Sequence, residues 1–296
     1  VGGRYVASTM PHELFRNSDD TYTFGEINWK DRFIGDDLTN PSMPFVQNTI
    51  KAISFHSSGR LFLVDSTAIN GSRARDFFNL WKYSDETIDD DRISIDITVS
   101  GVGSPLYISQ VGDDLFVICE LAQLIFTSLD QILTSRNGRI RKLTDFKTKS
   151  VIPGGNGLQF SIVDENLDIH RYVYQGAQTG LQYMGKMNTH DRPILLGLTP
   201  LQIYHFEDNL FITTSQGKVI LNTVSIVGTQ LVQNAWSRLS FMNDFLVVHI
   251  DVWEEKIRLV TEIHPHDLVL ASDLTLTPNS TIGFEAVYMH KPCISI

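Results

Sequence analysis

The stretch "VGDDLFVICELAQLIFTS", residues 111–128, decides the fold because the chain repeats its pattern. It aligns without gaps on "FEDNLFITTSQGKVILNT", residues 206–223, and each copy reads as a strand, a short turn and a second strand. The matching pairs are Asp113 with Asp208, Leu115 with Leu210, Phe116 with Phe211 and Ile125 with Ile220. A looser third copy, "SSGRLFLVDSTAING", occupies residues 57–71.

The spacing of these copies indicates a ring of similar hairpins. Leu61 and Leu115 are 54 residues apart, and Leu115 and Leu210 are 95 apart, close to two steps of about 45–50 residues. That step is the size of one blade of a β-propeller, whose closure leaves few bare sheet edges. We therefore predict a mainly β fold of many short antiparallel hairpins, β-propeller-like with irregular blades. A β-sandwich is the alternative.

The rest of the chain supports a strand-rich fold. Its apolar runs are short, rich in Val, Ile and Phe, and bounded by Gly, Asp, Asn and Pro. Strands are predicted at 52–56, 60–65, 93–100, 114–120, 123–128, 158–164, 168–175, 201–207, 209–215, 218–224, 244–253 and 256–263. Turns are predicted at Ser58-Gly59, Asn70-Gly71, Asn137-Gly138 and Gln216-Gly217. Helical patterns are scarce and are confined to the neighbourhoods of 75–82 and 128–136.

The charge of the chain limits its partners. Its 296 residues carry 24 basic and 34 acidic side chains, a net charge of −10 with His neutral. Such a surface does not hold phosphates by counterion release, so tight DNA binding is disfavoured, although DNA passing nearby would be tolerated. No apolar run approaches the ~18 residues of a membrane helix, and the first residues show no apolar signal segment. Cys119 and Cys293 are too few for a disulfide framework, and Cys119 reads as a buried hydrophobic residue.

Two Gly-Asp-Asp triplets, Gly35-Asp36-Asp37 and Gly112-Asp113-Asp114, raise the question of a metal-dependent reaction. Adjacent aspartates hold catalytic metal ions in some polymerases, but they also form ordinary turns. The repeat aligns the second triplet with Glu207-Asp208-Asn209, which is turn chemistry rather than metal chemistry. We therefore interpret the triplets as turns.

Three further candidate sites are better explained without a ligand. Asp89-Asp90-Asp91 lacks the alternating ligands and central Gly of a calcium loop, and we predict a solvated acidic loop. His264 and His266 have metal-like spacing but no evident third ligand, and "PGGNG" at 153–157 lacks the Lys-Ser/Thr of a phosphate loop.

The sequence motifs of two enzyme classes are missing, namely the Ser-x-Asp-x-Gly-x-Thr-Trp turns of sialidases and the Gly-x-Ser-x-Gly elbow. We predict no catalytic residue, no metal site and no cofactor, and a chain that is not an enzyme.

A series of short motifs in fixed order is more specific than any one of them. It runs through "TMPHELFR" (9–16), "FGEINWKDRFIGDDLTNPSMPFVQNTIKAISFHSSGRLFLVD" (24–65), "INGSRARDFFNLW" (69–81) and "IDDDRISIDITVSG" (88–101). In this order the chain closely resembles the tail nozzle proteins of short-tailed, podovirus-type bacteriophages, also called tail tubular protein B. The resemblance is dense over 9–128 and thinner to about residue 240, and Gln47 departs from the family's usual Gly. The residues that carry it are Met10-Pro11-His12, Trp29, Arg32, Gly35-Asp36-Asp37, Asn40-Pro41, Phe45, Arg60-Leu61, Ser72-Arg73, Asp76-Phe77-Phe78-Asn79 and Asp89 to Asp91.

The resemblance implies a structural protein of the virion tail that is assembled in the host cytoplasm. Six copies would form the distal tube, through which genomic DNA leaves without specific binding. Its partners would be tail adaptor and tail fibre proteins, with the host cell surface nearby. The family domain that holds these motifs is propeller-like, in agreement with the strand pattern. We expect residues 1–50 to lead into a nozzle domain at 51–296, in a fragment of a longer or processed chain or in a minimal nozzle without the N-terminal platform regions.

Roles for the motif residues follow from their chemistry. Aromatic residues are assigned to packing, namely Trp29, Phe77, Phe78 and Trp81. Arginines are expected to pair with Asp36, Asp37 and Asp76 and so to pin the loops, namely Arg32, Arg60, Arg73 and Arg75. Acidic residues are expected in exposed loops at a subunit junction or the lumen, namely Asp85, Glu86, Asp89, Asp90 and Asp91. Two other functions stay open: a propeller-type receptor- or glycan-binding tail protein, and an enzyme that degrades a surface polymer with paired carboxylates.

Overall fold

The computed structural model describes residues 10–19, 21–43, 50–83, 86–97, 101–128, 133–149, 151–154, 158–177, 179–187, 194–206, 209–227, 230–239, 247–253, 256–261, 275–277 and 293–295. Its strands are β1 (His12–Arg16), β2 (Tyr22–Glu26), β3 (Ala52–His56), β4 (Arg60–Val64), β5 (Ala68–Gly71), β6 (Ile93–Asp96), β7 (Pro105–Val111), β8 (Asp114–Cys119), β9 (Gln123–Ser128), β10 (Gly138–Thr144), β11 (Ile152–Gly154), β12 (Gln159–Val163), β13 (Ile169–Tyr174), β14 (Leu181–Lys186), β15 (Pro200–Phe206), β16 (Asn209–Thr214), β17 (Val219–Val227), β18 (Gln230–Leu239), β19 (Val247–Trp253), β20 (Lys256–Thr261), β21 (Thr275–Thr277) and β22 (Cys293–Ser295).

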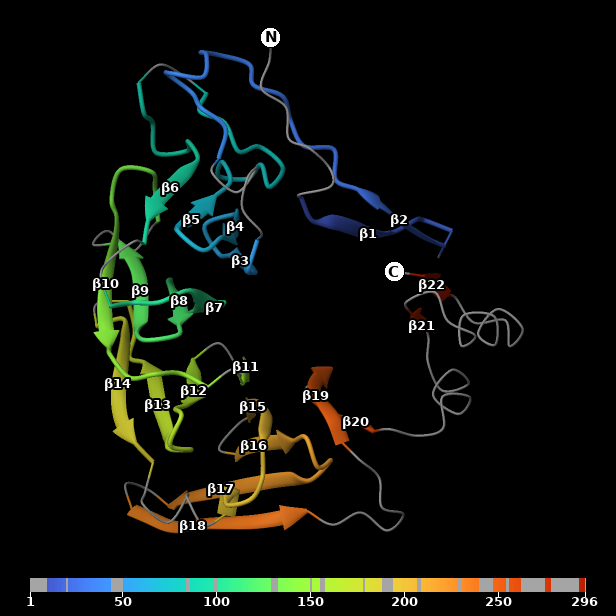
Figure 1. The fold of residues 1–296 in the computed structure, drawn as a ribbon, viewed down its shortest axis with the longest axis vertical. Helices are drawn as coiled ribbons and strands as arrows, with labels where there is room; N and C mark the ends of the chain where they lie inside the picture. The colour runs from blue at the N-terminus through green and yellow to red at the C-terminus, as the bar shows by residue number, and fades with distance from the viewer. Residues whose placement is uncertain are drawn as a thin grey trace.

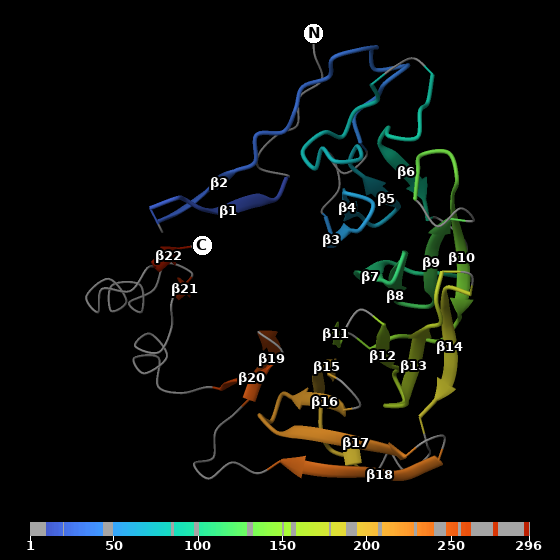
Figure 2. The same cartoon turned by 180° about the vertical axis from the view of Figure 1, so that it is seen from behind.

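Four sheets follow one another around an arc, as the blades of a propeller do (Figure 1). Their strand orders are β3-β4-β5-β6, β7-β8-β9-β10, β12-β13-β14 and β11-β15-β16-β17-β18. Neighbours within these blades pair antiparallel, except that β11 adds to β15 in parallel. The β1–β2 hairpin and the strands β19 to β22 lie on the open side of the arc (Figure 2). The prediction of a mainly β, propeller-like fold with irregular blades is confirmed.

The repeat noticed in the sequence corresponds to two blades. The second blade begins with Pro105 on β7 and the fourth with Pro200 on β15, at the 95-residue offset of the aligned copies. Both first strands carry a register shift at the same place, between Pro105 and Tyr107 and between Pro200 and Gln202. The looser copy at 57–71 is the β4–β5 part of the first blade. The second and fourth blades therefore share their strands, their turn and the register shift of their first strand.

The third blade, β12 to β14, is a copy that the sequence comparison missed. Its likeness to the first blade lies in the turn after the buried strand. The Asp65 carboxylate accepts hydrogen bonds from the Thr67 and Ala68 amides at 2.6 and 2.8 Å. The Asp164 carboxylate accepts them from the Asn166 and Asp168 amides at 2.8 and 2.9 Å. An aspartate therefore closes the turn after both β4 and β12, with a turn one residue longer in its second hydrogen bond after β12.

The hydrophobic core lies between blades rather than at one centre. One cluster joins the first and second blades, with the Phe62 and Phe126 rings edge to face at 5.9 Å. A second joins the second and third blades, where the Phe116 and Tyr172 ring centroids are 4.8 Å apart. A third joins the third and fourth blades. Because each apolar face is buried by the next blade, the arc is held together by contacts between sheets.

Three sequence predictions need correction. Asn70-Gly71 is not a turn but the end of β5, paired with Ser94 and Ile93 of β6. Residues 75–82 form turns and a bridge between Arg73 and Asp76 rather than a helix. In the 128–136 region, Ser128 ends β9 and residues 135–137 form a turn, while 129–132 lie outside the described residues.

Cys119 is fully buried on β8, as predicted, and burial raises the pKa of its thiol to about 12. Within the part of the chain that the structure describes, no helix combines the length and the apolar character needed to cross a membrane.

Candidate functional site

The segment after the β1–β2 hairpin, residues 27–43, folds back onto the first blade. Trp29 and Met43 are buried together with Leu61 and Leu63 of β4 and with Trp81. Trp29 also meets the partly buried Phe78 ring edge-on at 5.7 Å. These contacts agree with the packing role predicted for the motif aromatics, and they anchor both ends of the first Gly-Asp-Asp loop.

The first Gly-Asp-Asp triplet is a tight turn. Gly35 has a φ of +77°, which favours glycine. The Asp36 carboxylate accepts hydrogen bonds from the Thr39 amide at 2.9 Å, the Leu38 amide at 3.0 Å and the Thr39 hydroxyl at 3.0 Å. These bonds lower the pKa of Asp36. Because one carboxylate oxygen accepts all three, Asp36 has a structural role in this loop.

Asn40 fastens the first Gly-Asp-Asp loop to Lys82, which lies in the segment between β5 and β6. Asn40 is 2% exposed, and its side-chain amide donates to the Ile34 and Lys82 carbonyls at 2.9 and 3.2 Å. Its side-chain oxygen accepts from the Lys82 amide at 3.1 Å. One residue on from Asn40, the Pro41 carbonyl accepts a 2.6 Å hydrogen bond from Arg92. The Asn-Pro of the motif is thus a fastening point.

Arg32 forms the ion pair that the sequence predicted, with Asp37. Its Nη1 lies 2.7 Å from Asp37 Oδ1, and the side chain of Arg32 is 5% exposed against 88% for Asp37. The same nitrogen donates to the Asn40 carbonyl at 3.1 Å, and the guanidinium lies 5.4 Å from the centroid of Trp81. The Trp81 indole donates to the Lys30 carbonyl at 2.7 Å. Arg32 and Trp81 therefore hold the loop through contacts with Lys30, Asp37 and Asn40.

The other arginines bind differently from the prediction. Arg60 is 1% exposed and donates to the backbone carbonyls of Ser72, Asp91 and Asp89, each at 2.6 Å, rather than to a carboxylate. Burial lowers the pKa of its guanidinium to about 10. Arg73 stacks on Tyr83 at 4.5 Å.

Two residues of the "SRARDFFN" motif shape the loop around Arg60. The Ser72 hydroxyl accepts from the Leu61 amide at 2.9 Å and so ties the motif to β4. Arg75 has a φ of +60°, and its side chain packs against Gly59 in the β3–β4 turn. Phe77 is 38% exposed and meets the more exposed Phe55 of β3 edge-on at 5.3 Å. Phe77 therefore packs at the surface rather than in the core.

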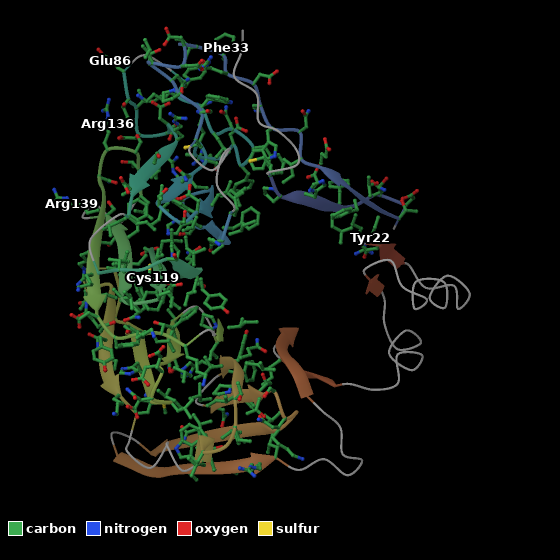
Figure 3. The ribbon with its side chains drawn as sticks, in the orientation of Figure 1. Tyr22, Phe33, Glu86, Cys119, Arg136 and Arg139 are labelled. Carbon is green, nitrogen blue, oxygen red and sulfur yellow. The ribbon has the colours of Figure 1, made fainter. Side chains whose placement is uncertain are left out.

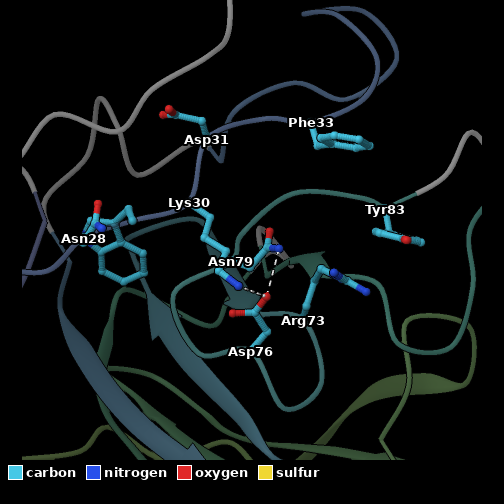
Figure 4. A pocket seen from close by; sticks show the side chains of 9 residues that line it. Asn28, Lys30, Asp31, Phe33, Arg73, Asp76, Asn79 and Tyr83 are labelled. Carbon is cyan, nitrogen blue, oxygen red and sulfur yellow. Dashed lines mark hydrogen bonds and ion pairs between the residues drawn. The ribbon is translucent and has the colours of Figure 1, made fainter.

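A polar pocket of about 500 Å³ lies between the loop and this motif. Asp76 is its anchor, since its carboxylate accepts from Lys30 at 2.9 Å and from the side-chain amide of Asn79 at 3.1 Å (Figure 4). Its lining residues are Asn28, Trp29, Lys30, Asp31, Phe33, Arg73, Asp76, Asn79 and Tyr83. With aromatic rings, amides and charges of both signs, the pocket suits a polar ligand or a partner's side chain.

The acidic run has two kinds of residue. Glu86, Asp89 and Asp90 are exposed, as expected for a loop facing solvent. Asp91 is fully buried, and its carboxylate accepts from the Tyr83 and Ile88 amides at 2.8 and 2.9 Å. Asp91 therefore closes the loop from inside and is not part of its exposed surface. Asp85 lies outside the described residues.

The second Gly-Asp-Asp triplet is a joint between blades. Gly112, with a φ of +61°, opens the two-residue turn between β7 and β8, and Tyr174 of β13 lies against it. Asp113 accepts from the Tyr174 hydroxyl at 2.9 Å, and Asp114 accepts from the Leu181 amide at 2.9 Å. The turn interpretation agrees with this geometry. Its contacts to the third blade carry no local sequence signal.

Metal chemistry finds no support in the described ranges, where no group of three or more His, Cys, Asp or Glu side chains is arranged to hold an ion. His264, His266 and residues 155–157 of "PGGNG" lie outside those ranges.

Comparison with known proteins supports the family resemblance that the motifs indicate. Residues 2–290 match the family model described as bacteriophage nozzle protein. Tail tubular protein gp12 of Escherichia phage T7 is 28% identical over 169 residues, which cover 55% of this chain and 21% of that protein. The chain thus spans about a fifth of this relative's length.

Solved structures similar to the chain have distant sequences and include a β-propeller domain. YCF48 from Cyanidioschyzon merolae is 9% identical with a TM-score of 0.44, covering 72% of this chain and 66% of its own. The Cps50 (Swd1) β-propeller domain of Myceliophteria thermophila is 6% identical with a TM-score of 0.43, covering 88% of this chain and 78% of its own. On the strength of the family match over nearly its whole length, this chain belongs to the bacteriophage nozzle protein family.

Proposed function

We propose that this chain forms part of the wall of the distal tail tube of a short-tailed phage, through which the genome leaves the virion. The observation that carries the proposal is the nozzle family match over residues 2–290. The T7 relative is named a tail tubular protein. Because the chain covers 21% of that relative, the role proposed is that of a wall domain in a larger tail assembly.

The physical character of the chain supports a conduit wall. Adjacent blades share buried clusters and are cross-linked by side chains such as Tyr174 of the third blade, whose hydroxyl donates to Asp113 of the second at 2.9 Å. A net charge of −10 repels a phosphate backbone over a Debye length of about 8–10 Å. Glu86, Asp89 and Asp90 are the exposed acidic residues that we propose for the lumen or a subunit junction.

The assembly proposed is a ring of six copies of this chain, in contact with tail adaptor and tail fibre proteins. Each copy would use two different faces, because a cyclic ring is built from head-to-tail contacts. We propose no reaction and no cofactor for it. The division into a leading segment at 1–50 and a nozzle domain at 51–296 stays a prediction.

The test is the native mass of the purified chain together with images of the particle by electron microscopy. A sixfold ring with a central opening is expected, and its wall should carry the 86–90 loop toward the opening or the junction. A ring whose 86–90 loops all lie on the outer surface would remove the electrostatic part of the proposal. A chain that stays monomeric at every concentration would remove the ring.

A second candidate function is glycan or receptor binding, which the pocket beside Arg73 favours. Exposed Phe33 and Tyr83 frame it, and Asn28 and Asp31 offer polar groups, a combination suited to sugar rings. A glycan array separates the two candidates. Saturable binding that is lost on Tyr83→Ala supports a binding module, whereas a conduit wall binds none of the glycans.

A further inference from the structure

The first Gly-Asp-Asp loop holds two large apolar side chains out into solvent. Phe33 is 89% exposed and Leu38 is 90% exposed. Single exposed apolar residues are common, but these two stand on a loop whose other side chains brace it from beneath. We call residues 33–39 the knob. A braced loop loses little conformational freedom on binding, which is the property of a preorganised contact surface.

The knob is acidic as well as apolar. Asp36 and Asp37 are both exposed beside Leu38, and the side chain of Asp37 is 88% exposed. The cation paired with Asp37 is Arg32, which is almost wholly covered. The outer surface of the knob therefore presents carboxylates around two apolar anchors. A partner surface for it needs cations and some apolar area.

The same chain carries such a surface on β10, the outer strand of the second blade. Within the described residues β10 pairs with β9 on one side and with no strand on the other. Arg139, Arg141 and Lys142 are exposed along it. Lys142 lies 3.5 Å from Asp145, but the side chains of Arg139 and Arg141 make no hydrogen bond or ion pair with any described residue. In a chain of net charge −10, this is a concentrated basic strip whose two arginines are not neutralised by a neighbouring described side chain.

The two surfaces do not meet within one copy. Figure 3 shows Phe33 at the upper end of the arc and Arg139 on its outer side, with Arg136 and Glu86 between them. We propose that the knob of one copy docks on β10 of a second copy, with Phe33 and Leu38 as anchors and the Asp36–Asp37 carboxylates facing Arg139 and Arg141. The inference rests on the proposed ring, and it supplies the two unlike faces that a head-to-tail contact requires.

The competing explanation is that the β10 cations only protect a bare sheet edge from pairing with other strands. That explanation predicts that charge reversal, Arg139→Glu with Arg141→Glu, leaves assembly unchanged, because glutamates protect an edge as well as arginines do. The docking proposal predicts that the same reversal abolishes assembly. The knob variant, Phe33→Ser with Leu38→Ser, discriminates further, since it leaves β10 untouched.

The experiment measures the assembly of the purified chain by sedimentation velocity. The knob variant and the strand variant are compared with a control variant, Leu196→Ser with Lys51→Glu, which makes matched changes at exposed positions elsewhere. Each test variant should raise the dissociation constant at least about 30-fold, the effect of losing a buried anchor or a facing charge pair. All four changed side chains are exposed, so near-wild-type circular dichroism is expected for each variant.

Mixing the two test variants decides the matter. The knob variant keeps an intact β10, and the strand variant keeps an intact knob, so an equimolar mixture can form one contact and no ring. The expected product is a 1:1 dimer, with each variant monomeric alone. A mixture that stays monomeric overturns the pairing of these two faces. A wild-type ring that all variants reproduce overturns the inference and leaves the proposed function standing, whereas a wild-type chain that stays monomeric overturns the inference together with the proposed ring.

Discussion

Replacing Asn40 with alanine tests whether the first Gly-Asp-Asp loop is braced as the contacts indicate. The substitution removes three hydrogen bonds, from Asn40 to the Ile34 and Lys82 carbonyls and from the Lys82 amide to Asn40. Each contributes about 1 kcal/mol net, and the partly buried Lys82 N–H left without an acceptor adds about 1 kcal/mol. We therefore expect the first blade to lose roughly 4 kcal/mol of stability, most of it in the loop.

The assay is urea unfolding followed by tryptophan fluorescence, because Trp29 and Trp81 lie in the cluster beneath the loop. Hydrogen exchange resolves the effect locally, and the Lys82 amide should exchange about a hundredfold faster or more in the variant. The control is Asn28→Ala, the same change at an exposed position at the start of the loop. A loss below ~0.5 kcal/mol for Asn40→Ala, or one equal to that of the control, would refute the bracing argument.

Three further predictions follow from buried groups. Gly112→Ala should destabilise the chain by at least ~2 kcal/mol by equilibrium unfolding, because its Cβ would lie 2.4 Å from the Tyr174 ring; Gly176→Ala, also at positive φ but in open space, should cost only ~1 kcal/mol. Burial lowers the pKa of His205 to about 3, so the unfolded chain binds more protons between pH ~3 and ~6.5; stability should fall by up to ~1.4 kcal/mol per unit as the pH drops through that window, and His205→Gln should flatten the slope. Cys119 should resist thiol reagents at neutral pH until the chain unfolds, as mass labelling would show.

Two of the strands predicted from sequence, β4 and β8, are buried on both faces. Every residue of β4 and of β8 is buried, so each reads as an unbroken apolar run between turn residues. The missed strands are edges and covers, such as β10 in "GRIRKLT" and the β1–β2 hairpin, whose side chains are largely exposed. An exposed strand is specified by its pairing partner, which lies elsewhere in the chain, so its own residues show little pattern.

The candidate site divides in the same way. The Arg32–Asp37 pair was predictable because both partners lie in one short motif. The role of Arg60 was not, since its acceptors are backbone carbonyls that any residue type can supply. Asp91 could not be told from Asp89 and Asp90 by type, and only the fold turns it inward. The knob was missed because large apolar side chains such as Phe33 and Leu38 are expected to be buried, whereas both are exposed.

The proposed contact also bears on how an acidic wall can contain cations without holding DNA. Each phosphate neutralised by an arginine releases counterions and strengthens binding, so a free strip of Arg139, Arg141 and Lys142 facing a lumen would slow a passing duplex. Covering that strip with the Asp36–Asp37 turn of the next copy neutralises it inside the wall. The covered strip then no longer offsets the negative charge of the exposed Glu86, Asp89 and Asp90 side chains. In this arrangement the contact that closes the ring is the same one that keeps the wall from binding the genome.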